Sequence, residues 1–117
     1  MTTQVKIGTE TTEDGSTTIF SLGGHLDATM VNMANEKIQE ILDGPSSHIL
    51  FDLKDLNYIS SAGLRILVYA AKKMKAKNGG IALCSVSDNI CKVLEISGMD
   101  KFLPMFEDRQ KAIEAIQ

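Results

Sequence analysis

The sequence predicts an α/β fold: a mixed β-sheet of about five strands with helices packed on it, in one domain that covers residues 1–117. Short apolar runs typical of strands alternate with longer segments in which apolar residues recur at helical spacing. An Asp-Gly pair near the N-terminus indicates a tight hairpin turn, which adds an antiparallel strand at the start. A length of 117 residues and a hydrophobic content of 44% suit a single core that needs no metal or disulfide.

The first two strands are expected to form a hairpin. Residues 4–8 alternate weakly between polar and apolar, and residues 17–24 form the returning strand after the turn at 14–15. A helix follows, for which Asp27 is the expected N-cap and Gly44 the stop signal. Its apolar side chains recur at helical spacing: Val31, Ala34, Ile38, Ile41 and Leu42.

Three more strands alternate with three more helices in the rest of the chain. The segment 48–53 is a compact apolar run, as expected of a strand buried on both faces. Pro104 restricts the last strand to an edge of the sheet, because proline lacks the N–H that a central strand donates. The expected strands are 48–53, 81–86 and 102–106, and the expected helices are 60–80, 87–98 and 108–116.

The resulting order is ββαβαβαβα. Strand–helix–strand units with short connections require parallel strands joined by right-handed crossovers. The sheet is therefore expected to be parallel except for the strand that the initial hairpin adds.

The composition argues against several classes of function. A net charge of -3 and a pI near 5.3 argue against a nucleic acid or an acidic membrane surface as partner. No apolar run approaches the roughly 20 residues that cross a bilayer, and the polar N-terminus does not resemble a signal peptide. Cys84 and Cys91 lack the spacing of a zinc site, so we expect no metal and no other cofactor, and reduced thiols in a cytoplasmic protein.

The chain offers little for catalysis. It has no GxSxG motif, and the imidazoles of His25 and His48 are more simply explained as loop and strand-end residues than as a catalytic base. Glycine-rich phosphate loops are absent as well. We therefore expect a protein that is not an enzyme.

Two adjacent serines, Ser60 and Ser61, stand where a strand ends and the second helix begins. A serine at an N-cap accepts a hydrogen bond from a free helix amide, which stabilises the helix by about 1 kcal/mol. The same position receives phosphate well, because helix N-termini collect unpaired amides and partial positive charge. Periodicity alone favours the capping interpretation, but a cap position can also serve as a phosphorylation switch.

Three stretches together resemble a known family. The segment DLNYISSAGLRIL, at 55–67, resembles the signature that opens the second helix of STAS domains, specifically of bacterial anti-sigma factor antagonists. The segments GHLDA at 24–28 and VLEISGMDKFLPMF at 93–106 resemble two further stretches of that family. The likeness spans nearly all of the chain in the same element order, so it implies the same fold.

The resemblance also implies a function. In this family, an anti-sigma factor with serine kinase activity phosphorylates the serine two residues before a Gly-Leu pair, which is Ser61 here. The unphosphorylated protein binds the kinase and releases the sigma factor, the phosphorylated protein dissociates, and a serine phosphatase restores the active form. We expect a monomer.

The same resemblance implies which residues meet the partner. Ser85, Ser87 and Asp88, in the loop after the fourth strand, are weaker candidates for the rim of this surface. The main candidates flank the phosphorylation site or face it from another loop: Asp27, Ser60, Ala62, Gly63, Leu64 and Arg65.

Two residues depart from the family pattern. Ser60 replaces a common aspartate, which would weaken kinase recognition or make Ser60 an alternative acceptor. Arg65 replaces a frequent glycine and is available to pair with a partner carboxylate or with the phosphate. An alternative function is a constitutive scaffold or adaptor STAS domain in a stress-signalling or transport complex, in which the serines only cap the helix and form a contact surface.

Overall fold

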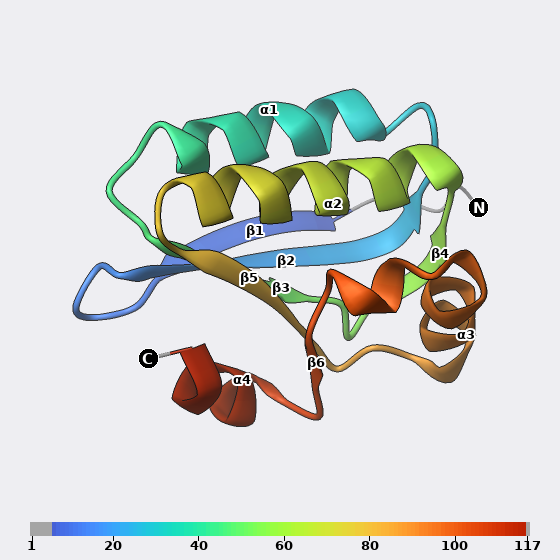
Figure 1. Ribbon diagram of the computed structural model, residues 1–117. Coiled ribbons are helices and arrows are strands. Elements are labelled where there is room, and N and C mark those ends of the chain that lie inside the picture. Colours follow the sequence, from blue (N-terminus) through green and yellow to red (C-terminus); the bar gives the residue numbers. More distant parts are fainter. Residues whose placement is uncertain (1–5, 117) are drawn as a thin grey trace.

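A computed structural model describes residues 6–116 of the chain. Within this range the fold has four helices, one short 3-10 helix and six strands (Figure 1). Their order is β1 (Lys6–Thr11), β2 (Thr17–Leu26), α1 (Val31–Leu42), β3 (His48–Asp52), β4 (Leu56–Ile59), α2 (Ser61–Ala76), β5 (Gly80–Cys84), α3 (Asp88–Ser97), η1 (Met99–Lys101), β6 (Met105–Phe106) and α4 (Arg109–Ile116).

The six strands form one mixed sheet in the order β1-β2-β3-β5-β6, with β4 paired to the end of β2. The pairing of β1 with β2 is antiparallel, and every other pairing is parallel. The predicted mixed sheet is therefore confirmed, and β6 forms the edge that Pro104 requires.

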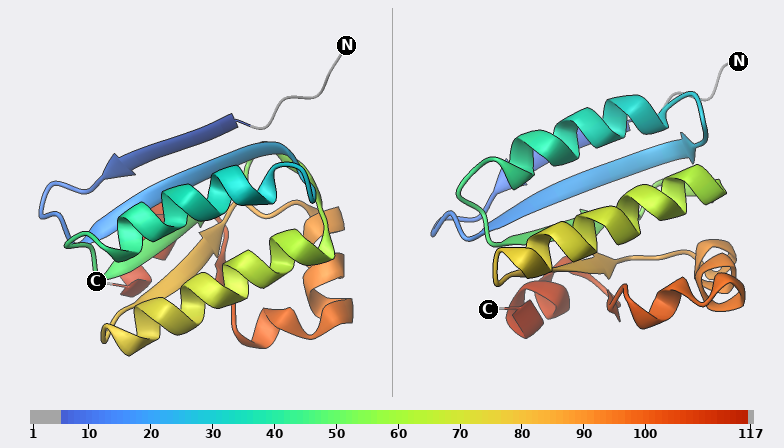
Figure 2. Two further views of the ribbon diagram at one scale, coloured as in Figure 1. Left: turned by 90° about the horizontal axis from the view of Figure 1, so that it is seen from above. Right: turned by 45° about the horizontal axis from the view of Figure 1, so that its top comes forward.

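The helices cover both faces of the sheet unequally. Helices α1 and α2 lie side by side on one face, α4 covers part of the other, and α3 stands beside β4 at one end (Figure 2). The larger core lies under α1 and α2 and includes the fully buried Phe20, Phe51 and Leu67. The smaller core, under α4, contains Leu50 and Ala112.

Strand β4 was not predicted from the sequence. Its four residues lack an alternating pattern, since Leu56 and Ile59 are buried while the two residues between them are exposed. It pairs with β2 from Gly24 to Leu26, beyond the part of β2 that β3 covers, and the register shifts between Gly24 and His25. This added strand directs the chain to the start of α2.

The sequence predicted the turn of the first hairpin correctly but not the start of the first helix. The turn at Asp14 is confirmed, because its carboxylate accepts hydrogen bonds from the Ser16 amide and hydroxyl at 3.0 and 2.8 Å. The part of the first predicted strand before residue 6 lies outside the described residues. The N-cap assigned to Asp27 is wrong: the N-cap of α1 is Met30, three residues later, the helix begins at Val31, and it has no side-chain cap.

Candidate functional site

The N-cap of α2 is Ser60, which joins the helix to the end of β2. Its Oγ accepts a hydrogen bond from the Gly63 amide at 3.1 Å and donates one to the Leu26 carbonyl at 3.1 Å. The Ser60 amide also donates to the Leu26 carbonyl, at 2.9 Å. The half-buried Ser60 hydroxyl is therefore committed to holding α2 in place.

Close packing at Gly63 fixes the first turn of α2 against the sheet. A Cβ at this position would lie 2.8 Å from Ile59 Cγ1, closer than real Cβ atoms approach other atoms, and 3.0 Å from the Leu26 carbonyl oxygen, which is also tighter than most Cβ contacts. The next residue, Leu64, is buried in the larger core. The Gly-Leu pair of the motif thus has a packing role beneath the site.

Ser61 is the first residue of α2, and its side chain is exposed. Within residues 6–116, its hydroxyl makes no hydrogen bond to another residue, in contrast to that of Ser60. The first turn of this 16-residue helix contains no acidic residue. The Ser61 hydroxyl therefore lies free at a helix N-terminus whose partial positive charge no side chain of that turn offsets.

Asp27 lies close to this N-terminus because the Ser60–Leu26 hydrogen bonds bring the two chain segments together. Its carboxylate accepts hydrogen bonds from the Thr29 hydroxyl at 2.6 Å and from the Thr29 amide at 3.1 Å. The hydrogen bond from the Thr29 hydroxyl is the main cause of a lowered pKa at Asp27. The carboxylate is consequently ionised at neutral pH and forms a small turn instead of capping α1.

The remaining predicted site residues divide by exposure. Ala62 is half-buried and Arg65 is exposed on the same turn as Ser61. In the loop after β5, Ser87 caps α3 by accepting a hydrogen bond from the Ile90 amide at 3.3 Å, and the neighbouring Asp88 is exposed. The first turn of α2 therefore presents Ser61, Arg65 and part of Ala62 at the surface, above the buried Gly63 and Leu64.

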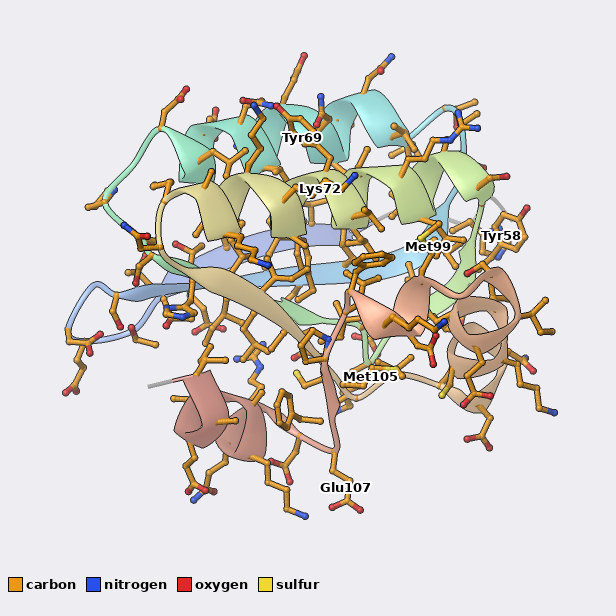
Figure 3. The ribbon with its side chains drawn as sticks, in the orientation of Figure 1. Tyr58, Tyr69, Lys72, Met99, Met105 and Glu107 are labelled. Carbon is orange, nitrogen blue, oxygen red and sulfur yellow. The ribbon has the colours of Figure 1, made fainter. Side chains whose placement is uncertain are left out.

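An aromatic pair beside the site was not identified from the sequence. Tyr58, half exposed on β4, contacts the ring of His25 on β2 edge-on, with the ring centroids 5.7 Å apart. Figure 3 shows Tyr58 at the end of the molecule where α2 begins. The only sequence signal was an aromatic residue three positions before Ser61, whose exposure depends on the unpredicted strand.

Other kinds of site find no support in residues 6–116. No group of three or more His, Cys, Asp or Glu side chains there is arranged to hold a metal ion. No helix in the described part of the chain is long and apolar enough to cross a membrane. His48 begins β3, at the end of the sheet opposite to Ser61, so it is not positioned to act as a base for that hydroxyl.

Comparison with known proteins identifies the family. The STAS domain sequence pattern matches residues 9–112. The chain is 33% identical to BtrV of Bordetella bronchiseptica, a candidate anti-sigma factor antagonist, over 99 residues that make up 85% of each protein. It is 27% identical to the anti-sigma F factor antagonist of Paenibacillus polymyxa, over 85% of this chain and 86% of that protein. These relatives are named as regulators and not as enzymes.

Solved structures support the same assignment. An anti-sigma factor antagonist from Mycobacterium paratuberculosis superposes with a TM-score of 0.87 at 18% identity, over 97% of this chain and 94% of that one. Unphosphorylated SpoIIAA, an anti-sigma factor antagonist, superposes with a TM-score of 0.82 at 22% identity, over 95% and 96%. These likenesses show a common fold. The match of residues 9–112 to the STAS domain pattern and the 33% identity to BtrV establish that the chain belongs to the STAS domain family.

Proposed function

We propose that this chain is an anti-sigma factor antagonist that binds an anti-sigma factor serine kinase and releases a sigma factor until the kinase phosphorylates Ser61. The observation that carries the proposal is the contrast between the two serines. The Ser60 hydroxyl is used in two hydrogen bonds, whereas the Ser61 hydroxyl is exposed and unused within the described residues. This contrast favours Ser61 over Ser60 as the acceptor.

The position of Ser61 suits a phosphate. A phosphoserine adds about two negative charges at neutral pH, and the first residue of a helix is where negative charge stabilises the helix. The fold would therefore tolerate the modification, while a partner that packs closely on this turn would lose contact with it. Such a residue can change binding without unfolding the domain.

The relatives support the regulatory part of the proposal. Proteins named as anti-sigma factor antagonists match this chain over most of its length. SpoIIAA, whose fold this chain shares, has been solved in an unphosphorylated and a phosphorylated form. The kinase, its ATP and the sigma factor that the proposal requires would all be found in the cytoplasm.

We assign the predicted partner-binding residues two roles. Asp27, Ala62 and Arg65 would contact the kinase directly, because each has exposed surface around Ser61. Ser60, Gly63 and Leu64 would act by positioning, because they are hydrogen-bonded or buried under this turn. We expect the unbound protein to be a monomer, which size-exclusion chromatography with light scattering would test.

The test is phosphorylation by a kinase encoded next to the gene for this chain. Purified protein, kinase and ATP are incubated, and the modified residue is identified by peptide mass spectrometry. We expect one phosphate on Ser61, full loss of labelling in Ser61→Ala, and continued labelling in Ser60→Ala. Label on Ser60 alone, or none on either serine, would contradict the proposal. A serine phosphatase should remove the label.

Partner binding provides the second readout. Ser61→Asp should weaken kinase binding by more than tenfold, which corresponds to about 1.4 kcal/mol, whereas Ser61→Ala should bind like the unmodified chain. Gln110→Glu is the matched control, since it adds one negative charge near the start of α4, on the opposite face of the sheet. Equal affinity for all variants would favour the constitutive adaptor.

A further inference from the structure

A groove runs along the flank of α2, away from Ser61. Its hollow has a volume of about 490 Å³ and lies between α2, the outer edge of β5 and the segment from η1 to β6. The floor is apolar and is formed in part by Val68, Ala71 and Ile81. Phe102 lines it with a side chain that is 55% exposed. A large exposed aromatic side chain over an apolar hollow is typical of a protein-binding surface.

Lysines alone carry charge at this groove. Lys72 and Lys75 reach it from α2, and Lys101 reaches it from η1, while no acidic residue of the described part of the chain lines it. None of the three lysines forms a salt bridge with another described residue. The helix dipole explains lysines near the C-terminal end of α2 but not Lys101 on a separate element. We call this surface, formed by the three lysines, Val68, Ala71, Ile81 and Phe102, the basic groove.

The basic groove also borders an unpaired stretch of strand edge. The Gly80 amide donates to the Ser47 carbonyl on the β3 side, and the Leu83 amide donates to the Pro104 carbonyl on the β6 side. Because successive residues of a strand direct their main-chain groups to opposite edges, Ile81 directs its N–H and C=O to the same edge as Leu83. Strand β6 begins only opposite Leu83, so no strand within residues 6–116 pairs with this edge at Ile81.

We propose that the basic groove binds an acidic segment of a partner protein in extended conformation. One apolar side chain of the segment fills the hollow beside Phe102, and flanking carboxylates pair with Lys72, Lys75 and Lys101. The main chain of the segment lies along the free edge of β5, the mode in which extended peptides add to sheet edges. Among the described residues, the charged groups of the groove are all lysines, whereas the chain as a whole has a net charge of -3. This local excess of positive charge argues for a specific acidic partner.

An anionic membrane fits the basic groove less well. Polybasic segments that hold proteins on such membranes have about four to eight basic residues, whereas this rim has three and the chain is acidic overall. A lipid headgroup would also make no use of the strand edge. The observations therefore favour a protein segment.

The basic groove is independent of the proposed switch. Lys72 follows Ser61 by 11 residues on the same helix, which corresponds to roughly 16 Å along the axis. Figure 3 shows Lys72 near the middle of α2, away from the end of the helix where Tyr58 lies. Both surfaces can thus be occupied at once, and binding at the basic groove does not require phosphorylation.

The test uses a labelled synthetic peptide, acetyl-Glu-Thr-Phe-Thr-Glu-Thr-Glu-amide, whose Phe and Glu side chains share one face when the peptide is extended. Its affinity for the full chain is measured by fluorescence anisotropy. We expect the double variant Lys72→Glu/Lys75→Glu to bind roughly tenfold or more weakly, and Phe102→Ala to lose roughly tenfold. All these side chains are exposed, and circular dichroism verifies that the variants fold.

Three controls make the result specific. Lys54→Glu/Lys92→Glu changes the net charge equally at two exposed lysines outside the basic groove and should bind like the unmodified chain. Ser61→Asp should also bind normally, so a failed kinase experiment and a failed peptide experiment remain distinct. A peptide of the same composition with Phe moved by one position should bind more weakly.

Several outcomes would overturn the proposal. These are no binding of the peptide, equal binding by the groove and control variants, or no dependence on the position of Phe. Binding to vesicles of phosphatidylserine and phosphatidylcholine, with loss in Lys72→Glu/Lys75→Glu but no binding of the peptide, would assign the groove to a membrane instead.

Discussion

The start of α2 and the start of α3 share one capping device but differ in charge. In each, a serine directly before the helix accepts a hydrogen bond from the amide three residues later: Ser60 from Gly63 at 3.1 Å, and Ser87 from Ile90 at 3.3 Å. Helix α3 then continues with Asp88 at its first position, where a carboxylate offsets the helix dipole. Helix α2 continues with Ser61, a neutral hydroxyl.

This difference separates a structural helix start from a candidate regulatory one. At α3, both the capping group and the compensating charge are built into the sequence. At α2, the cap is present and the charge is absent, while tight packing beneath the turn holds the exposed Ser61 in place. A negative charge added by phosphorylation at α2 would make the two helix starts electrostatically alike.

The largest effect on stability is expected at the packing beneath α2. Gly63→Ala forces a Cβ against Ile59 and the Leu26 carbonyl, which costs about 3 kcal/mol of overpacking and regains about 1 kcal/mol of helix propensity. We expect a net loss of about 2 kcal/mol in the free energy of unfolding, measured by urea denaturation. Gly8→Ala is the control, because the atom nearest to a Cβ added at Gly8 lies 3.9 Å away, which is an ordinary van der Waals contact. An unchanged or raised stability of Gly63→Ala would refute the packing argument.

This packing requirement marks the limit of what the sequence can predict about the site. The capping serine and the exposed first position of α2 follow from local signals, namely a polar pair between an apolar strand and a helical pattern. The need for glycine at position 63 depends on the packing of Ile59 and of Leu26, a residue far away in sequence, against the first turn of α2. Tyr58 was missed for the same reason, since its exposure depends on the pairing of β4 with β2.

The fold shows the same division between local and long-range information. The turn expected at Asp14 is confirmed, and the helix expected over residues 87–98 ends at Gly98, the C-cap of α3, with a φ of 76°. Asp27 was misassigned as a cap because its residue type suits both a cap and a turn, and only the structure shows its carboxylate bound to Thr29. The basic groove unites Lys72 with Lys101 from separate elements, which no local pattern indicates.

A smaller effect is expected when the two capping serines are removed in parallel. Ser87→Ala should lower the free energy of unfolding by about 1 kcal/mol, through loss of one cap bond. Ser60→Ala should lower it by about 1.5 kcal/mol, because the Leu26 carbonyl also loses a donor. Urea denaturation of both variants measures the difference. Equal losses would mean that the bond to Leu26 adds nothing and that the two caps are energetically equivalent.

The smallest effect, and the most direct test of the comparison, concerns charge at the first helical position. At low salt, Ser61→Asp should raise the free energy of unfolding by about 0.5 kcal/mol, and Asp88→Asn should lower it by a similar amount. Both changes in the free energy of unfolding should shrink as salt is added, since these groups are exposed.

The nearby Asp27 carboxylate repels a negative charge at position 61 and so opposes the gain from Ser61→Asp. The double variant Ser61→Asp/Asp27→Asn should therefore have a higher free energy of unfolding than the sum of the two single changes gives. A loss of more than about 1 kcal/mol in Ser61→Asp would mean that the start of α2 does not accept negative charge, and that a phosphate there would act by disrupting the helix instead of by blocking a partner.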